Sequence, residues 1–183
     1  PPRGQVLVCG QAEASDPYGA RCALQMAQLR AAHPLHFWAQ PDRYFEQGEL
    51  ASVAADFGVM PSLFEPCGLV REEFFAAGTP LVASNTGGLA DHVKPYCEAD
   101  GTGAGLVFDG HAHTALLTQL ERALALYADL RHYAALRQNA HAAACDVGQT
   151  AAFWEAELQR LRACRAAHQL DLDLELHAEE HAM

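Results

Sequence analysis

Short apolar runs alternate with longer amphipathic segments along most of the chain. The short runs contain few polar positions, which is typical of strands buried on both faces. The longer segments repeat apolar residues every three or four positions, as helices do. The predicted strands are Gln5–Cys9, Leu35–Ala39, Phe57–Pro61, Leu81–Ser84 and Gly105–Phe108. The predicted helices are Pro17–Ala32, Glu49–Ala55, Leu69–Ala77, Gly87–Val93, 112–144 with a break, and 150–168.

Strands and helices that alternate with such short connections form βαβ units with right-handed crossovers. We therefore predict an α/β fold over residues 1–168, namely a Rossmann-like parallel sheet of about five or six strands with helices on both faces. In such sheets ligands bind at the carboxyl ends of the strands, so candidate chemistry is expected in the loops that follow them.

Residues 169–183 are predicted to form a separate acidic tail. Within it, Leu170–Leu176 alternates leucine with aspartate or glutamate. A strand would place all of these leucines on one face, whereas a helix would spread them around its circumference. Two interpretations stay open: a frayed acidic terminus, or a strand that lies at the edge of a sheet or is added to a protein partner.

Composition narrows the classes of function. The chain has 183 residues, enough for one domain with a core but too few for two full α/β domains. Its formal net charge of −11 argues against a nucleic-acid partner or an anionic membrane surface. No apolar run approaches the roughly 20 residues of a transmembrane helix. The first residue is Pro1, so we expect a processed chain or part of a longer one.

The six cysteines have no CxxC spacing, so we expect neither a zinc site nor a disulfide framework. Such thiols are typical of a reducing compartment, either the cytoplasm or an organelle. Lys94 is the one lysine, and eleven arginines carry the remaining positive charge. Cations are therefore scarce for a protein that would bind phosphate.

The segment Met60–Val93 carries the candidate chemistry. A loop containing Glu65 leads into a helix start at Gly68, where free backbone N–H groups and the helix dipole favour phosphate or sugar oxygens. Glu73 follows about two turns into that helix, so the two carboxylates could bracket a ligand with hydroxyls at both ends. The next strand ends at Ser84 and leads into a second glycine-bearing helix start. Two adjacent starts of this kind predict a cleft for a diphosphate.

The motifs Phe64–Leu69 (FEPCGL), Gly78–Pro80 (GTP) and Thr86–Leu89 (TGGL) resemble the C-terminal half of starch and glycogen synthases. These enzymes are retaining glycosyltransferases of the GT-B architecture. The resemblance is specific within Met60–Val93 and looser over the rest of the chain. Glu65 and Glu73 also fit the paired-glutamate pattern of related retaining glycosyltransferases.

The resemblance implies a role for each residue of the motifs. Glu65 would be the catalytic residue, placed beside the donor glucose to support the charge that develops at its anomeric carbon. Glu73 would bind the nucleotide ribose, and Tyr44 would stack on the base. Backbone groups would bind the sugar and phosphate oxygens. These groups belong to Cys67, Gly68, Leu69, Thr86, Gly87 and Gly88.

The resemblance further implies transfer of glucose, with retention, from ADP-glucose or UDP-glucose to an α-1,4-glucan. No metal or other cofactor is expected. The family's acceptor-binding N-terminal lobe is absent from the chain, as is the loop whose Arg and Lys clamp the diphosphate. The family's Asp-x-Ser-Trp motif is also missing, because the chain has Cys145–Gln149 at that point. Two alternatives remain: a noncatalytic subunit with a structural role in a larger assembly, and a carbohydrate- or nucleotide-binding regulator.

Overall fold

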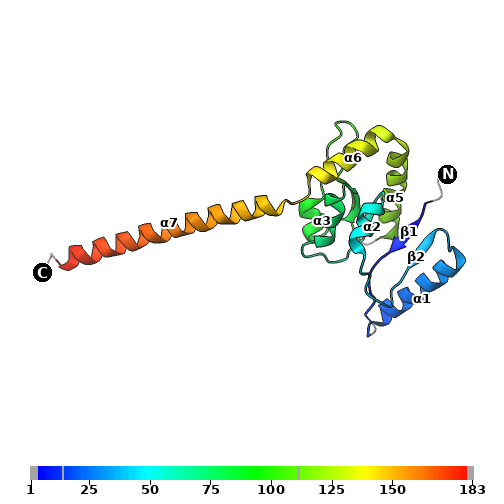
Figure 1. The fold of residues 1–183 in the computed structure, drawn as a ribbon, viewed down its shortest axis with the longest axis horizontal. Helices are drawn as coiled ribbons and strands as arrows, with labels where there is room; N and C mark the ends of the chain where they lie inside the picture. The colour runs from blue at the N-terminus through cyan, green and yellow to red at the C-terminus, as the bar shows by residue number, and fades with distance from the viewer. Residues whose placement is uncertain (1–3, 14, 111, 181–183) are drawn as a thin grey trace. The chain divides into compact units, whose positions relative to one another are not determined.

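The computed structural model describes residues 4–13, 15–110 and 112–180, with side-chain surroundings described as far as residue 166. The chain forms two compact units, Pro1–Ala143 and Ala144–Met183. The first unit contains β1 to β5 and α1 to α6, and the second contains α7 (Figure 1). The candidate site therefore lies wholly within the first unit.

The first unit begins with a two-stranded parallel sheet, β1 (Val6–Val8) and β2 (Phe37–Ala39), joined by α1 (Pro17–Ala32). The bounds of α1 are those predicted. Asp16 fixes its start, because the Asp16 carboxylate accepts the backbone N–H of Tyr18 at 2.9 Å and proline follows at the first helical position.

A second parallel sheet contains β3 (Gly58–Met60), β4 (Leu81–Ser84) and β5 (Gly105–Phe108), with β4 in the centre. Leu81, Val82 and Ala83 of β4 are each 0% exposed. Such complete burial explains why the sequence of this strand is almost continuously apolar.

Helices cover the second sheet. They are α2 (Gly48–Ala54), α3 (Leu69–Ala76), α4 (Gly87–His92), α5 (His113–Ala128) and α6 (Leu130–Ala142). Helix α5 packs on β4 and β5. Helix α6 packs on both α3 and α5 (Figure 1). The predicted break in the 112–144 segment falls at Asp129, whose carboxylate caps α6 by accepting the N–H of Arg131 at 3.1 Å.

The core lies between β4, β5 and the helices that cover them. Its buried cluster contains Val82, Tyr96, Leu106, Phe108, Ala123, Leu126 and Leu136. A buried hydroxyl group lies just before β4, where Thr79 Oγ1 donates to the carbonyl of Ser52 at 2.8 Å. That bond connects the end of α2 to the start of β4 and so helps to place the strand from which the candidate site extends.

The predicted α/β fold of parallel strands flanked by helices is confirmed. One feature differs from the expected single sheet, because β1 and β2 form a sheet separate from β3, β4 and β5. Among the described residues, β1 and β3 each have a strand partner along one edge alone.

The C-terminal segment also differs from the prediction. Helix α7 extends over Val147–Glu180, so the segment Leu170–Leu176 is helical and the strand interpretation is wrong. Extending an existing helix adds one hydrogen bond per residue without a new nucleation cost, whereas a strand needs a neighbouring edge. The two compact units divide at Ala143–Ala144, earlier than the expected boundary at residue 168. Within the described residues, no helix has the length and apolar character needed to cross a bilayer.

The packing of α6 gives a test of this core. Leu136 is 0% exposed, whereas Leu130 on the same helix is 78% exposed. Leu136→Ala should lower the free energy of unfolding by about 2–5 kcal/mol, because it removes buried apolar atoms and leaves a cavity. Leu130→Ala, the matched control, should change it by about 0.5 kcal/mol or less. Urea denaturation measures both, and equal effects would contradict this packing of α6.

Candidate functional site

The loop between β3 and α3 holds the Glu65 side chain in a defined orientation. Ser62 Oγ donates to Glu65 Oε2 at 3.2 Å. The backbone N–H of Gly68 donates to Glu65 Oε1 at 3.1 Å. Both carboxylate oxygens therefore have donors within the loop, while the residue remains half-buried at the carboxyl end of β3. The carboxylate is fixed before any ligand arrives.

Gly68 is the N-cap of α3 and has a left-handed backbone with φ of +81°. An L-residue rarely adopts this conformation, and a Cβ here would lie 3.2 Å from Leu89 Cδ2. The first N–H groups of α3, beginning at Leu69, have no acceptor inside the helix. The glycine thus allows the chain to turn sharply and to present these donors beside Glu65.

A second loop, between β4 and α4, packs directly against the first. Ser84 Oγ at the end of β4 donates to the carbonyl of Ser62 at 2.7 Å. The N–H of Gly88 donates to the carbonyl of Glu65 at 2.9 Å. A Cβ on Gly87 would collide with that same carbonyl, and a Cβ on Gly88 would collide with the carbonyl of Cys67. The two loops are in backbone-to-backbone contact, and both glycines are required by it.

The structure brings most of the predicted site residues together. These are Glu65, Cys67, Gly68, Leu69, Thr86, Gly87 and Gly88. Thr86 is the N-cap of α4, with its side chain making no capping bond. Cys67 and Leu69 are exposed at the end of the first loop.

Two predicted site residues take no part in this contact. Glu73 is exposed in the second half of α3. Tyr44 is 73% exposed in the connection between β2 and α2. In the part of the chain that is described, no hydrogen bond or ring contact joins Tyr44 to the Glu65 loop. The predicted roles of Glu73 and Tyr44 remain predictions.

The cations nearest in sequence to the two helix starts are already engaged. Arg71 is buried, forms an ion pair with Glu72, and has its guanidinium 5.6 Å from the centre of the Phe75 ring. Lys94 Nζ donates to the carbonyl of Asp91 at 2.8 Å. A negatively charged ligand at this site would therefore be met chiefly by backbone N–H groups at the helix starts.

Comparison with known proteins places this arrangement in a family. Residues 4–142, more than half of the chain, match the family model described as "Glycosyl transferases group 1". The chain belongs to the group 1 glycosyltransferases. The match spans both sheets and both loops of the candidate site, which agrees with the resemblance found in the sequence.

Related proteins with assigned names are glycogen synthases. The glycogen synthase of Vibrio atlanticus is 37% identical over 106 residues, which cover 58% of this glycosyltransferase chain and 22% of the relative. That of Myxococcus xanthus is 44% identical over 80 residues, covering 44% and 16% respectively. The chain therefore spans about a fifth of the length of these curated relatives.

Solved structures share the fold. The catalytic domain of starch synthase IV from Arabidopsis thaliana, bound to ADP and acarbose, matches with a TM-score of 0.67 and 24% identity, over 86% of this chain and 32% of that one. Sucrose-phosphate synthase from Thermosynechococcus elongatus matches with a TM-score of 0.61 and 28% identity, over 89% and 39%. Both enzymes extend well beyond the part that this chain matches.

Three polar residues at the strand ends were missed by sequence reasoning. Ser62 and Ser84 connect the two loops, and Asn85 connects the second loop to β5. Asn85 Nδ2 donates to Asp109 Oδ1 at 2.7 Å, and its backbone N–H donates to the carbonyl of Phe108 at 2.8 Å. Their positions could have identified them from the sequence, because each of these residues ends or directly follows a predicted parallel strand, where site residues are expected.

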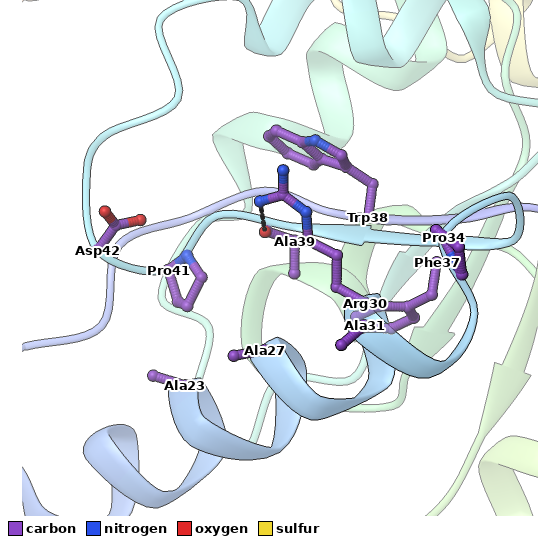
Figure 2. A pocket seen from close by; sticks show the side chains of 10 residues that line it. All are labelled: Ala23, Ala27, Arg30, Ala31, Pro34, Phe37, Trp38, Ala39, Pro41 and Asp42. Carbon is purple, nitrogen blue, oxygen red and sulfur yellow. Dashed lines mark hydrogen bonds between the residues drawn. The ribbon is translucent and has the colours of Figure 1, made fainter.

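A hollow lies away from this site, between α1 and β2 (Figure 2). It has a volume of about 640 Å³. Figure 2 shows small side chains of α1, such as Ala23 and Ala27, along one side and Trp38 on the other, with Arg30 donating to the carbonyl of Ala39 at 3.4 Å. This hollow reflects loose packing of a helix of small residues on a two-stranded sheet, and it shares no residue with the Glu65 loop.

The contact between the two loops gives a test. Gly88→Ala should force the Cys67 carbonyl away from α4 and cost about 1–3 kcal/mol of stability, because backbone atoms rather than a flexible side chain fill the space. Gly48→Ala at the start of α2 is the matched control, since nothing lies within 4 Å of its added Cβ. Thermal denaturation measures stability, and NMR shifts of Gly68 and Glu65 report the loop. Unchanged shifts in Gly88→Ala would contradict the contact.

Proposed function

We propose that this chain is the nucleotide-sugar-binding module of a retaining glucosyltransferase that transfers glucose from ADP-glucose or UDP-glucose to an α-1,4-glucan. The observation that carries the proposal is the contact between the Glu65 loop and the start of α4, which fixes one carboxylate beside two adjacent helix starts. The names of the glycogen synthase relatives, together with the ADP in the starch synthase structure, support the same substrate class.

In this proposal Glu65 lies beside the donor glucose. Its carboxylate, held by Ser62 and Gly68, would stabilise the positive charge that develops at the anomeric carbon as the nucleotide departs. A preorganised carboxylate needs little reorganisation during the reaction, which is why its fixed orientation matters.

The two helix starts bind the rest of the donor. At the first start, the N–H groups of Cys67 and Leu69 would bind sugar and phosphate oxygens, while the N–H of Gly68 stays on Glu65 Oε1. At the second start, the N–H groups of Thr86 and Gly88 already donate to the carbonyls of Ser84 and Glu65. The distal phosphate would therefore be bound by the N–H of Gly87 and the hydroxyl of Thr86. Glu73 would bind the ribose hydroxyls and Tyr44 would stack on the base. Both of these side chains are exposed and so are accessible to a ligand.

The chain supplies only part of such an enzyme. It spans 22% of the Vibrio atlanticus relative and 32% of the starch synthase IV domain. We propose that the acceptor glucan and the cations that neutralise the leaving diphosphate are bound by a second lobe. Closure of that lobe would exclude water and align donor with acceptor.

One observation favours a second candidate, a noncatalytic subunit with a structural role. Arg71 and Lys94, the cations nearest in sequence to the helix starts, are engaged by Glu72 and by the Asp91 carbonyl. A domain that keeps this fold without a cation for the diphosphate could serve an assembly without binding donor.

Calorimetric titration with ADP-glucose and UDP-glucose tests the proposal. Saturable binding of at least one donor is expected. Glu65→Gln preserves the size of the side chain, but its amide group has one acceptor oxygen for the two donors, Ser62 Oγ and the Gly68 N–H, that Glu65 accepts. The loop then loses one of these bonds, and donor binding should weaken about tenfold, equivalent to about 1.4 kcal/mol. Glu121→Gln, at an exposed position of α5, is the matched control and should leave the affinity unchanged.

Three other results would contradict parts of the proposal. Absence of binding up to millimolar donor would favour the structural subunit. Donor binding that Glu65→Gln leaves intact would place the sugar away from Glu65. Binding of free ADP or UDP with the same affinity as the sugar nucleotide would mean that the glucose is not recognised at all.

A further inference from the structure

The loop that carries Glu65 leaves the second sheet where the backbone ladder between β3 and β4 ends. Met60 and Ala83 are the last paired residues of these two strands. Beyond them the carbonyl of Ser84 accepts the N–H of Thr86 at 2.9 Å, so it is no longer directed to β3. Within the described residues, no backbone hydrogen bond to β4 holds the loop beyond Met60. Another interaction must determine how the loop leaves the sheet.

A side-chain hydroxyl group provides that interaction. Ser84 Oγ donates to the carbonyl of Ser62 at 2.7 Å and lies 3.5 Å from the carbonyl of Met60. Ser84 is only 4% exposed, and the three residues before it in β4 are completely buried. The hydroxyl group therefore starts from a fixed position. It attaches the first loop to β4 two residues beyond the end of the ladder.

A second hydroxyl group continues from Ser62 to the carboxylate. Ser62 Oγ donates to Glu65 Oε2 at 3.2 Å, and the Gly68 N–H donates to Glu65 Oε1 at 3.1 Å. Gly68 belongs to the start of α3, so Ser62 is the donor that connects this carboxylate to the sheet. Two consecutive hydrogen bonds thus lead from the buried strand β4 to the half-buried Glu65.

We propose that Ser84 is a positioning residue for Glu65, that it acts through Ser62, and that it contributes to binding the sugar of the donor rather than its nucleotide. This inference rests on the proposed function, in which Glu65 lies beside the glucose. Among the described residues, neither hydroxyl group bonds to a residue that is proposed to bind the nucleotide. Its effect should therefore be confined to the sugar.

The physical reason is the orientation of the carboxylate before the ligand binds. A glutamate side chain that is already held in one orientation loses less conformational freedom when it binds a sugar hydroxyl. If either link in the pair of hydrogen bonds is removed, Glu65 can turn away from the sugar. The sugar contact should then weaken about fivefold, which corresponds to the net contribution of one hydrogen bond.

NMR of the unliganded chain tests the link from Ser84 to Glu65. In Ser84→Ala the Ser62 carbonyl loses its donor, so the Glu65 carboxylate should move and the amide proton of Gly68 should change its chemical shift. Ser52→Ala is the matched control, because Ser52 is 3% exposed and its hydroxyl group donates to the Glu49 carbonyl within α2. It should leave Gly68 unchanged. An unchanged Gly68 amide in Ser84→Ala overturns the proposal.

Calorimetric titration with a sugar nucleotide and its free nucleotide tests the effect on the sugar. Ser84→Ala and Ser62→Ala should each weaken binding of ADP-glucose or UDP-glucose about fivefold and leave that of ADP or UDP within about twofold. Ser62→Thr keeps the hydroxyl group and should retain the affinity for the sugar nucleotide. Equal weakening of both ligands would indicate structural damage alone, and overturns the proposal.

The double variant Ser62→Ala/Ser84→Ala separates one connected pathway from two independent effects. If Ser84 acts through Ser62, the double variant should bind the sugar nucleotide as weakly as Ser62→Ala alone, because the link to Glu65 is already broken. A loss of about 25-fold, the product of the two single effects, overturns the proposal.

The proposed function and the role of Ser84 can fail separately. If the unsubstituted chain binds no sugar nucleotide, the proposed function is wrong and the role of Ser84 in sugar binding is overturned with it. If the chain binds a sugar nucleotide and neither serine substitution weakens that binding, the proposed function stands and the role of Ser84 alone is overturned.

Discussion

Direct contact between two stretches of backbone is the constraint on which the candidate site depends. The carbonyl oxygens of Glu65 and Cys67 occupy the space where side chains on residues 87 and 88 would lie, so α4 must begin with two glycines. The hydrogen bond from Gly88 to Glu65 then joins the loops that follow β3 and β4. A carboxylate placed in this way keeps its position independently of a ligand, as preorganised electrostatic stabilisation requires.

The second sheet makes that contact possible. Since β4 is buried on both faces, its end can move little. The bond from Ser84 to Ser62 therefore holds the loop between β3 and α3 in a fixed position. Thr79 fixes the other end of the strand against α2. Polar bonds of this kind contribute modest net stability, about 1 kcal/mol each, but leaving their buried atoms unpaired costs more. The bonds of Ser84 and Thr79 therefore contribute more to the position of β4 and the adjoining loop than to the stability of the fold.

The first sheet contrasts with this. Helix α1 has no buried residue, and the apolar side chains of Val6 and Leu7 in β1 are exposed. A two-stranded parallel sheet with one helix buries too little surface to be independently stable. The connection that contains Tyr44 follows this first sheet, so it is less firmly supported than the Glu65 loop, which follows the buried second sheet.

Signals local to the sequence determined the start of α1 at Asp16 and Pro17, the break before α6 at Asp129, and the glycines that the loops of the site require. These features depend on a few neighbouring residues, on capping bonds and on backbone conformation, so the sequence alone reveals them. It also determined the α/β class and the family motif around Glu65. Tertiary structure alone decided which strands pair and how Ser62, Ser84 and Asn85 connect the loops. It also decided that Leu170–Leu176 continues a helix. Strand pairing and contacts between loops depend on residues that are distant in the chain. A periodic pattern within one segment does not indicate which other segment will pack against it.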